Sequence, residues 1–403
     1  RSELAEIAEE CINERAAPGL VALVAYQGKV VYEEAFGYHT YKREKKVKKN
    51  DLFDLASVTK VAATTLAIMK MVEDGEIQLD VPIGDYLVEL KGSNKESLTI
   101  RSMLAHRSGL RSWIPFYVNT LAPKSRTPRP SSQYYRKTPT GDFQVPVTDK
   151  LFMHTAYIDS IWHQIRESEL TNLGQYRYSD LGFYLMARLV KRVSGMQLDE
   201  YVNYHFYRPM GLHSLTFLPK QRFPLDRIVP SERDNYFRQA VVHGDVHDMG
   251  AAMLGGVSGH AGLFGTANDL AVIFQMLVQQ GVYGGRTYLK STTIQEFAHR
   301  YPEELRRGLG FDMKQLNPNR NLNMSYLAAE STFGHTGFTG TAVWADPEED
   351  LVFVFLSNRT YPSMKNTRLN RTDIRPRMHS VAYLSINPRA TEEAIERLMT
   401  TGP

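Results

Sequence analysis

Strand-forming segments occur near both ends of this chain, and helix-forming segments fill the region between them. Near the N-terminus, two apolar runs lie on either side of a glycine-containing turn, at Leu20–Tyr26 and Val30–Phe36. In the C-terminal third, a second pair of apolar runs flanks an acidic turn, at Thr341–Ala345 and Leu351–Ser357. Each pair predicts a β-hairpin. The most economical topology joins the two hairpins in one antiparallel sheet.

This pattern predicts an α/β fold, of the α+β type, with two lobes. We expect residues 1–55 and 300–403 to form a sheet lobe flanked by helices, and residues 56–299 to form a mainly helical lobe. Apolar periodicity predicts helices at Glu3–Arg15, 57–74, Thr99–Ala105, Asp180–Ser194, Leu198–Tyr207, Asn268–Gln280, His379–Ser385 and Thr391–Thr400. A cleft between two lobes is the default place for a binding site.

The segment 111–175 differs in composition from the rest of the predicted helical lobe. It holds six prolines with aromatic residues interleaved, and residues 121–140 carry five basic side chains and no acidic one. We expect a long, partly irregular excursion at the rim of the cleft. Its charges favour either a solvated loop or a surface that receives an anionic or sugar-bearing substrate.

Composition excludes several classes of protein. The net charge is +4 over 403 residues, which does not suggest a nucleic-acid-binding protein, and no apolar run approaches the length of a membrane-spanning helix. Cys11 is the single cysteine, so an intramolecular disulfide is impossible. The chain starts at Arg1 without a signal core, and we expect a mature form or a segment of a longer protein.

Ser57 and Lys60 form the first pattern that could carry chemistry. Their spacing is nearly one helical turn, which places both side chains on the same face of the predicted helix. A serine hydroxyl becomes a nucleophile when a neighbouring base removes its proton, and a lysine of suitable pKa can be that base. The alternative is an N-cap serine beside a surface lysine.

Two further triplets lie later in the chain. Tyr178-Ser179-Asp180 precedes a predicted helix, and a tyrosine oxygen near cations can relay protons. The alternative is a buried aromatic residue beside Asp180 as an N-cap. His335-Thr336-Gly337 precedes the C-terminal hairpin, where an edge strand could orient a substrate carbonyl or carboxylate, and its alternative is a tight turn. A loop rich in histidine and aspartate holds His243, His247 and His260 with Asp245 and Asp248. His243 and His247 have a metal-ligand spacing, but the glycines around them disfavour a helix there, and structural hydrogen bonds are the alternative.

Taken in order, these triplets resemble the Ser-x-x-Lys, Tyr-x-Asn and Lys/His-Thr-Gly motifs of the penicillin-recognising serine hydrolase superfamily. The superfamily includes class C β-lactamases, penicillin-binding proteins, D,D-peptidases and esterases. Four flanking stretches are similar as well: Phe53–Ala56, Leu98–Leu110, His260–Leu270 and Phe355–Asn358. The resemblance extends from about residue 18 to 385.

The resemblance implies the β-lactamase/transpeptidase-like fold and acylation of Ser57 by an amide, ester or lactam carbonyl, followed by hydrolysis. Lys60 and Tyr178 would share the proton transfers, and the backbone N–H groups of Ser57 and Phe338 would form the oxyanion hole. Thr336 would line the substrate edge, beside Gly337. No metal or other cofactor is implied.

Two residues depart from the family pattern. Asp180 stands where many members have Asn, and its charge would raise the pKa of Lys60 unless another cation compensates. The alternatives are that Asp180 pairs with Lys60 or that a neighbour such as Asn172 takes its place in the site. His335 stands where β-lactamases have Lys, which disfavours typical β-lactamase activity. Some D-alanyl-D-alanine carboxypeptidases of the superfamily carry the same His-Thr-Gly triplet.

The expected function is therefore a serine hydrolase acting on a peptidoglycan-related or D-amino-acid peptide or amide. A carboxylesterase or weak β-lactamase on the same fold is the first alternative, and a non-catalytic penicillin-binding-like sensor or auxiliary domain is the second. We expect a small-molecule, peptide or cell-wall-fragment substrate, no nucleic-acid partner, and a glycosidase neighbour if the chain belongs to a longer protein. The resemblance favours a bacterial periplasmic or secreted location, with the cytoplasm left open.

Overall fold

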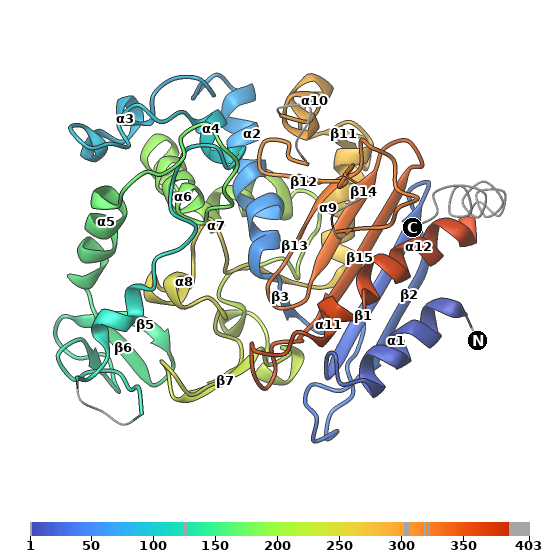
Figure 1. The fold of residues 1–403 in the computed structure, drawn as a ribbon, viewed down its shortest axis with the longest axis horizontal. Helices are drawn as coiled ribbons and strands as arrows, with labels where there is room; N and C mark the ends of the chain where they lie inside the picture. Colours follow the sequence, from blue (N-terminus) through green and yellow to red (C-terminus); the bar gives the residue numbers. More distant parts are fainter. Residues whose placement is uncertain (1, 124–126, 302–305, 318–319, 321, 387–403) are drawn as a thin grey trace.

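The computed structural model describes residues 2–123, 127–301, 306–317, 320 and 322–386. Its centre is a six-stranded antiparallel sheet that combines both ends of the chain (Figure 1). In spatial order, the strands are β12 (Asp312–Met313), β13 (Phe333–Thr336), β14 (Ala342–Asp346), β15 (Leu351–Ser357), β1 (Gly19–Tyr26) and β2 (Lys29–Gly37). Leu23 pairs with Val354, which fixes the register at the junction between the two ends.

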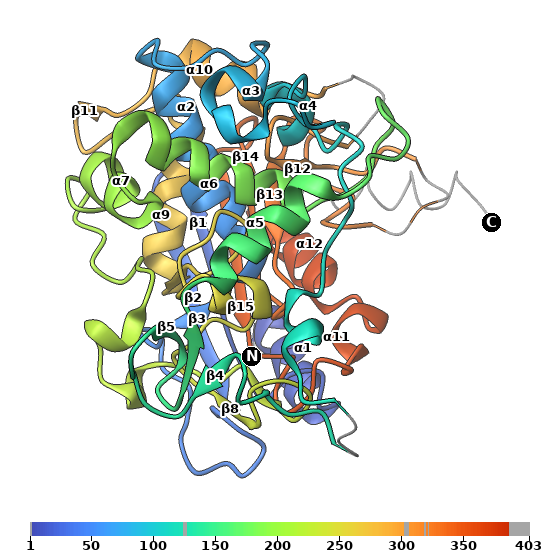
Figure 2. The same ribbon diagram turned by 90° about the vertical axis from the view of Figure 1, so that its left-hand side faces the viewer.

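Helices cover both faces of this sheet (Figures 1 and 2). Side chains of β1 alternate between the two faces, and Leu23 packs into the core shared with α9 (Ala267–Val278), whereas Ala22 packs with α1 (Glu3–Asn13) and α12 (Ile374–Ile386). Because both faces are covered, β14 and β15 are buried along their whole length. The predicted sheet of N- and C-terminal strands flanked by helices is therefore confirmed.

Most of the remaining helices lie in the middle of the chain, and several of them form the layer seen at the front of Figure 2. They are α2 (Thr65–Glu73), α3 (Ile83–Tyr86), α4 (Ile100–Leu104), α5 (Tyr157–Glu167), α6 (Leu181–Ser194), α7 (Leu198–Val202), α8 (Met249–Met253) and α10 (Ser291–Ala298), with α11 (Arg368–Arg371) beyond the sheet. Thr99 caps α4 as its sequence predicts, because its hydroxyl accepts the backbone N–H of Ser102.

The helix predicted over residues 57–74 is not one regular α-helix. A 3₁₀ turn at Ala56–Val58 is followed by a π-helical turn at Lys60–Thr64, and regular α2 begins only at Thr65. Local widening of a helix is frequent at functional sites. Residues 58–69 are buried on all sides, so packing rather than one apolar stripe determines this segment.

The excursion at 111–175 contains more regular structure than its prolines predict. Three short strands form a sheet in the order β4 (Tyr135–Arg136), β6 (Leu151–His154) and β5 (Phe143–Thr148), and α5 follows. Pro146 is tolerated because β5 is an edge strand with an irregular register at that point.

Three two-stranded ribbons complete the described structure: β3 (Phe53–Asp54) with β9 (Phe264–Gly265), β7 (Glu232–Asp234) with β8 (Ala240–Val242), and β10 (Val282–Tyr283) with β11 (Arg286–Thr287). The helix predicted at 391–400 lies outside the described residues. Within the described ranges, none of the helices is long and apolar enough to cross a membrane.

Candidate active site

Ser57 lies in a turn that is held by segments from both ends of the chain. Ala56, which precedes it, adopts a left-handed conformation with φ 46°, unusual for a residue with a side chain. The Asp54 carboxylate accepts the Ala56 N–H, and β3 pairs with β9. From the C-terminal region, the hydroxyl groups of Thr339 and Thr341 donate to the carbonyls of Asp54 and Leu55. These contacts fix the position of Ser57 at the start of the helical segment that continues into α2.

Lys60 is fully buried, and its Nζ donates hydrogen bonds to two oxygens and forms an ion pair with a third. The hydrogen-bond acceptors are Ser57 Oγ at 2.8 Å and the His260 carbonyl at 3.1 Å, and the ion pair is with Asp180 Oδ1 at 2.7 Å. Burial opposes the charge on this ammonium, but the Asp180 carboxylate and the Tyr178 oxygen outweigh it and raise the pKa of Lys60. The structure therefore favours a charged Lys60 that contacts the serine oxygen.

Tyr178 lies just before α6 and contacts Ser57. Its hydroxyl lies 3.1 Å from Ser57 Oγ, and its ring centroid lies 4.6 Å from the ring of His106. Two cations face the ring: Lys60 Nζ at 5.1 Å and the Arg307 guanidinium at 5.5 Å. Burial, aided by the Asp180 charge, raises the pKa of Tyr178, while Lys60 acts in the opposite direction.

Asp180 occupies the position before α6, but its side chain does not cap that helix. Its backbone is already helical, and its carboxylate turns to Lys60 instead. The interpretation of Asp180 as an N-cap is therefore wrong, because the buried ammonium offers a stronger partner than a backbone N–H. Asn172, the other candidate for this place, is exposed and does not line the site.

His335 lies on β13, at the open edge of the sheet. The two-residue β12 pairs with Phe333 and Gly334 only, which leaves His335 and Thr336 without a partner strand on that side. His335 Nδ1 donates to the Thr336 carbonyl at 2.6 Å. Burial, with the nearby charges of Arg307 and Lys60, holds the pKa of His335 well below its usual range, so the ring is neutral.

Arg307 supplies a buried cation that the sequence analysis missed. Its side chain is 4% exposed, lies 3.7 Å from Asp312 and donates to the Tyr176 hydroxyl at 3.0 Å. It also lies over the Tyr178 ring. No motif surrounds Arg307 in the sequence, and only the folded chain places it beside Tyr178.

Gly337 brings the end of β13 against the Ser57 turn. A Cβ added there would lie 2.0 Å from Thr341 Oγ1 and 2.6 Å from the Leu55 carbonyl, closer than real Cβ atoms approach. Phe338, the next residue, is half exposed and lines the same cavity as Ser57. Glycine is therefore needed to bring the backbone of Phe338 beside the serine.

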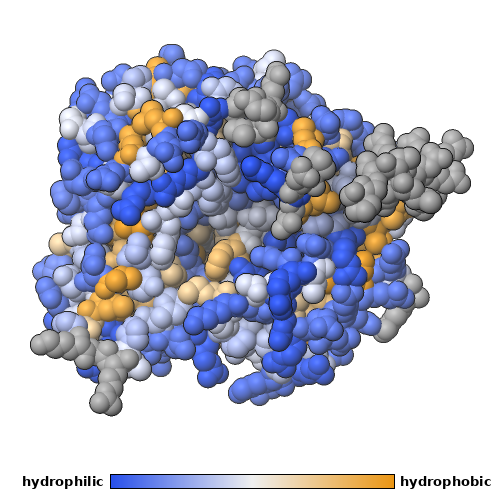
Figure 3. All heavy atoms as spheres, viewed as in Figure 1, coloured by the Kyte–Doolittle hydropathy of each residue, from blue (hydrophilic) through white to orange (hydrophobic). Residues whose placement is uncertain are grey.

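The cavity beside Ser57 has a volume of about 400 Å³. The space-filling view shows a hollow near the centre of the molecule with apolar residues gathered in it (Figure 3). The walls are mostly aromatic and sulfur-containing side chains with a few acids and histidines: Trp113, Tyr117, Tyr178, Asp180, His247, Asp248, Met249, His260, Phe338 and Met364. Trp113 and Tyr117 come from the excursion, which therefore contributes to the rim of the cavity.

One wall carries a hydrogen-bonded chain that the sequence analysis did not assign. His260 Nε2 lies 2.7 Å from Asp248 Oδ1, and its Nδ1 lies 2.9 Å from the Ser258 hydroxyl. The His260 ring stacks on Tyr184 with centroids 4.1 Å apart. The motif-like stretch that begins at His260 directs attention to this residue, and Asp248 directly follows His247 in the loop rich in histidine and aspartate.

The two histidines with ligand-like spacing, His243 and His247, make hydrogen bonds to different partners. His243 Nε2 contacts the Ile228 carbonyl at 2.7 Å, and His247 Nε2 contacts Glu232 at 2.9 Å. Within the part of the chain that the structure describes, no group of three His, Cys, Asp or Glu residues is arranged to hold a metal ion.

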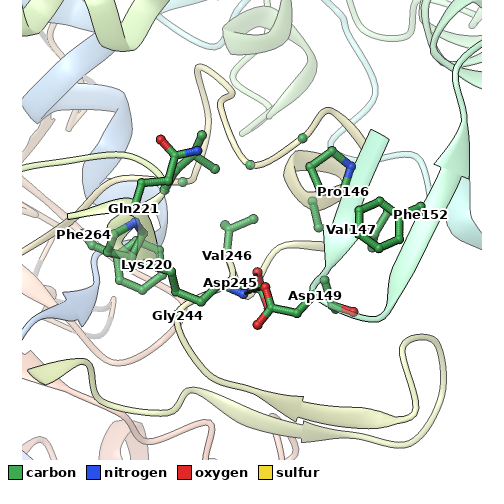
Figure 4. Close-up of a pocket in the computed structure, with 17 residues that line it drawn as sticks. Pro146, Val147, Asp149, Phe152, Lys220, Gln221, Gly244, Asp245, Val246 and Phe264 are labelled. Carbon is green, nitrogen blue, oxygen red and sulfur yellow. Dashed lines mark hydrogen bonds and ion pairs between the residues drawn. The ribbon is translucent and has the colours of Figure 1, made fainter. Parts of the chain in front are cut away.

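A second cavity of about 360 Å³ lies behind the same wall (Figure 4). The β5–β6 hairpin forms one side of it, with Val147 and Phe152, and the opposite side includes Val246. Lys220 bridges Asp149 at 2.5 Å and Asp245 at 2.6 Å at its edge. The segment 244–262 contributes residues to both cavities and separates them.

Comparison with known proteins agrees with this architecture. The Beta-lactamase family model matches residues 4–375. The chain is 28% identical over 380 residues to a protein of Salmonella gallinarum named "Putative D-alanyl-D-alanine carboxypeptidase", covering 88% of this chain and 81% of that protein.

Solved structures are similar in fold. A penicillin-binding protein homologue from Caulobacter crescentus superposes with a TM-score of 0.63 at 20% identity, over 88% of this chain and 90% of that one. EstCE1, described as a hydrolase with promiscuous acyltransferase activity, superposes with a TM-score of 0.65 at 18% identity, over 94% and 97%. Since the family model spans nearly the whole chain, the protein belongs to the Beta-lactamase family, within the penicillin-recognising serine hydrolases, and is a serine hydrolase.

Proposed function

We propose that this hydrolase acts through an acyl-enzyme on Ser57 and that its substrate is a D-amino-acid or peptidoglycan-related peptide or amide. One observation carries the proposal: Ser57 Oγ is within hydrogen-bond distance of both Lys60 Nζ and the Tyr178 hydroxyl, beside a cavity. The name of the Salmonella relative supports the choice of substrate class.

In the proposed mechanism, Tyr178 in its ionised form accepts the Ser57 proton as Oγ bonds to the substrate carbonyl carbon. Lys60 remains charged, because Asp180 holds it as a cation, and it stabilises both oxygens during the transfer. The backbone N–H groups of Ser57 and Phe338 bind the carbonyl oxygen as it becomes negative. Tyr178 then returns the proton to the leaving amine. In the second step, water gives a proton to Tyr178 and attacks the acyl carbon, and Ser57 Oγ leaves with that proton as the acid is released.

A carboxylesterase is the second candidate, favoured by the lining of the cavity. Aromatic and methionine side chains dominate its walls, and the lining contains neither lysine nor arginine among the described residues. A neutral His335 also attracts a substrate carboxylate weakly, which disfavours typical β-lactamase chemistry. Comparison of a D-alanine amide with a short-chain ester as substrates distinguishes the two candidates.

The direct test is the intact mass of the protein after incubation with an activated ester and, separately, with a penicillin. We expect a mass increase in the wild type and none in Ser57→Ala, together with loss of turnover by about 10⁴-fold or more. Circular dichroism of Ser57→Ala checks that the variant is folded. An equal adduct on Ser57→Ala, or no adduct with either reagent on the wild type, would overturn the acyl-enzyme proposal.

A further inference from the structure

The cavity beside Ser57 carries acidic groups with aromatic walls, and this combination suits a particular class of substrate. We propose that the cavity receives an acyl donor bearing a primary ammonium group and that Asp248 binds this ammonium. The inference rests on the proposed function, because it concerns the same site, and it adds the charge of the substrate and the residue that selects it.

Asp248 is positioned to keep one carboxylate oxygen for a ligand. Its Oδ1 accepts the Ala251 N–H at 2.8 Å, as the N-cap of α8, and it also contacts His260 Nε2 at 2.7 Å. Both recorded hydrogen bonds of the carboxylate thus fall on Oδ1. The side chain lines the cavity and is 22% exposed, which leaves part of the carboxylate open to a ligand.

The carboxylate is held in its charged form by its surroundings. Burial opposes ionisation of Asp248, but the neighbouring His260 and the Ala251 N–H outweigh it and lower the pKa of this carboxyl. His247, on the same wall, is hydrogen-bonded to Glu232 behind it, which adds another acidic group near the cavity.

The other acid of the cavity is already paired. Asp180 contacts the buried ammonium of Lys60, so its charge is balanced within the protein. Asp248 has His260 and His247 as its ionisable neighbours, and no lysine or arginine joins them among the residues described as lining the cavity. A cationic substrate group is therefore attracted to Asp248, and an anionic acyl group is repelled from it.

The remaining walls favour the same charge. Trp113 and Tyr117 line the cavity with aromatic rings, whose faces attract an ammonium group, whereas the ring of Phe338 already has the Arg359 guanidinium over it at 4.6 Å. A carboxylate together with several aromatic faces is a recurrent arrangement for binding organic cations. The cation loses its hydration water there but gains an opposite charge and the negative faces of the rings. The ammonium could be the α-amine of a D-amino-acid amide or a side-chain amine of a peptide, and the experiment separates these sources.

The test uses matched pairs of p-nitroanilide substrates that differ in one amine. D-alanyl against N-acetyl-D-alanyl tests an α-amine, and Nα-acetyl-D-lysyl against Nα-acetyl-D-norleucyl tests a side-chain amine. The measured quantity is the ratio of kcat/KM within each pair. Because both members are measured on the same preparation, a variant that is partly unfolded lowers both rates and leaves the ratio unchanged.

We expect the wild type to prefer the amine in at least one pair, and Asp248→Asn to reduce that preference about tenfold or more. Asparagine keeps an acceptor oxygen for the Ala251 N–H and removes only the charge. Asp142→Asn is the matched control, because Asp142 lies on the excursion, 84% exposed, and does not line the cavity. The control should retain the wild-type preference.

A binding measurement keeps the inference testable if turnover is absent. In the Ser57→Ala background, titration calorimetry with D-alaninamide, N-acetyl-D-alaninamide and Nα-acetyl-D-lysinamide should show tighter binding of an amine-bearing ligand, and Asp248→Asn should abolish the difference. No preference for either amine, or a preference that survives Asp248→Asn, overturns the inference. The proposed acyl-enzyme is judged separately by the mass of the Ser57 adduct.

Discussion

At the scale of single residues, Asp180 determines the charge state of the groups around Ser57. Its carboxylate lies 2.7 Å from Lys60 Nζ, and it raises the pKa of both Lys60 and Tyr178. Arg307, 5.5 Å from the centre of the Tyr178 ring, has the opposite effect and favours the ionised phenol that the proposed mechanism requires. Two opposing charges, the Asp180 carboxylate and the buried Arg307 guanidinium, therefore act on the pKa of the Tyr178 phenol.

Asp180→Asn should shift the pH dependence of acylation to lower pH. Removal of the negative charge lowers the pKa of both Lys60 and Tyr178, so the base forms at lower pH whichever of the two accepts the proton. The measurement is kcat/KM for an ester across the pH range in which activity rises. A rise that stays in place or moves to higher pH would show that Asp180 does not control the base.

The sequence allowed part of this chemistry to be predicted. The contact of Ser57 with Lys60 follows from helical spacing, and Tyr178 followed from its resemblance to a family motif. Asp248 and Arg307 could not be predicted, because each belongs to the site only through tertiary contacts and neither lies in a recognisable motif. The pairing of Asp180 with Lys60 was one of several possibilities until the fold excluded the exposed Asn172.

At the scale of elements, the end of β13 is fitted closely to the turn that carries Ser57. Thr339 and Thr341 tie the connection between β13 and β14 to that turn, and Gly337 lies directly against it. The helix after Ser57 begins with a 3₁₀ turn and a π-helical turn, which apolar periodicity could not predict because all its faces are buried. Likewise, the prolines of the excursion led us to expect an irregular segment, and the three-stranded sheet in it was not predicted.

Gly337→Ala should reduce acylation by about 10²-fold or more, because its Cβ would push the Phe338 N–H away from the substrate oxygen. The measurement is the rate of adduct formation on folded protein. Gly334→Ala is the control: its Cβ would strike the Val343 carbonyl within the sheet, away from Ser57. If both variants lose stability equally and acylate at the wild-type rate, Gly337 does not position the oxyanion site.

At the scale of the whole molecule, the sheet joins segments that are more than 300 residues apart in the chain. β1 lies between β2 and β15, and Leu23 faces the core at this junction. The two hairpins were predictable from local sequence patterns. Their union in one sheet was predictable because it is the simplest topology for two hairpins at the ends of a chain. The place of each helix against the sheet was not predictable, because apolar periodicity identifies a buried face and not its partner.

Leu23→Ala should lower the free energy of unfolding by about 2–5 kcal/mol, because Leu23 is fully buried in the central sheet. Urea titration measures the change. The control is Val30→Ala on β2, where the side chain is 49% exposed and the expected change is within about 0.5 kcal/mol. Equal midpoints for the two variants would contradict the central role of this junction.

The union of both chain ends in one sheet also sets the order in which the molecule becomes complete during synthesis. A ribosome releases Ser57 and Lys60 early, whereas β13, Phe338, β14 and β15 are complete only after residues up to 357 have been made. Until then, β1 lacks its neighbour β15 and the serine turn lacks the threonine contacts that fix it. A nascent chain therefore carries Ser57 for most of its translation before the strands and threonines that hold its turn have been made.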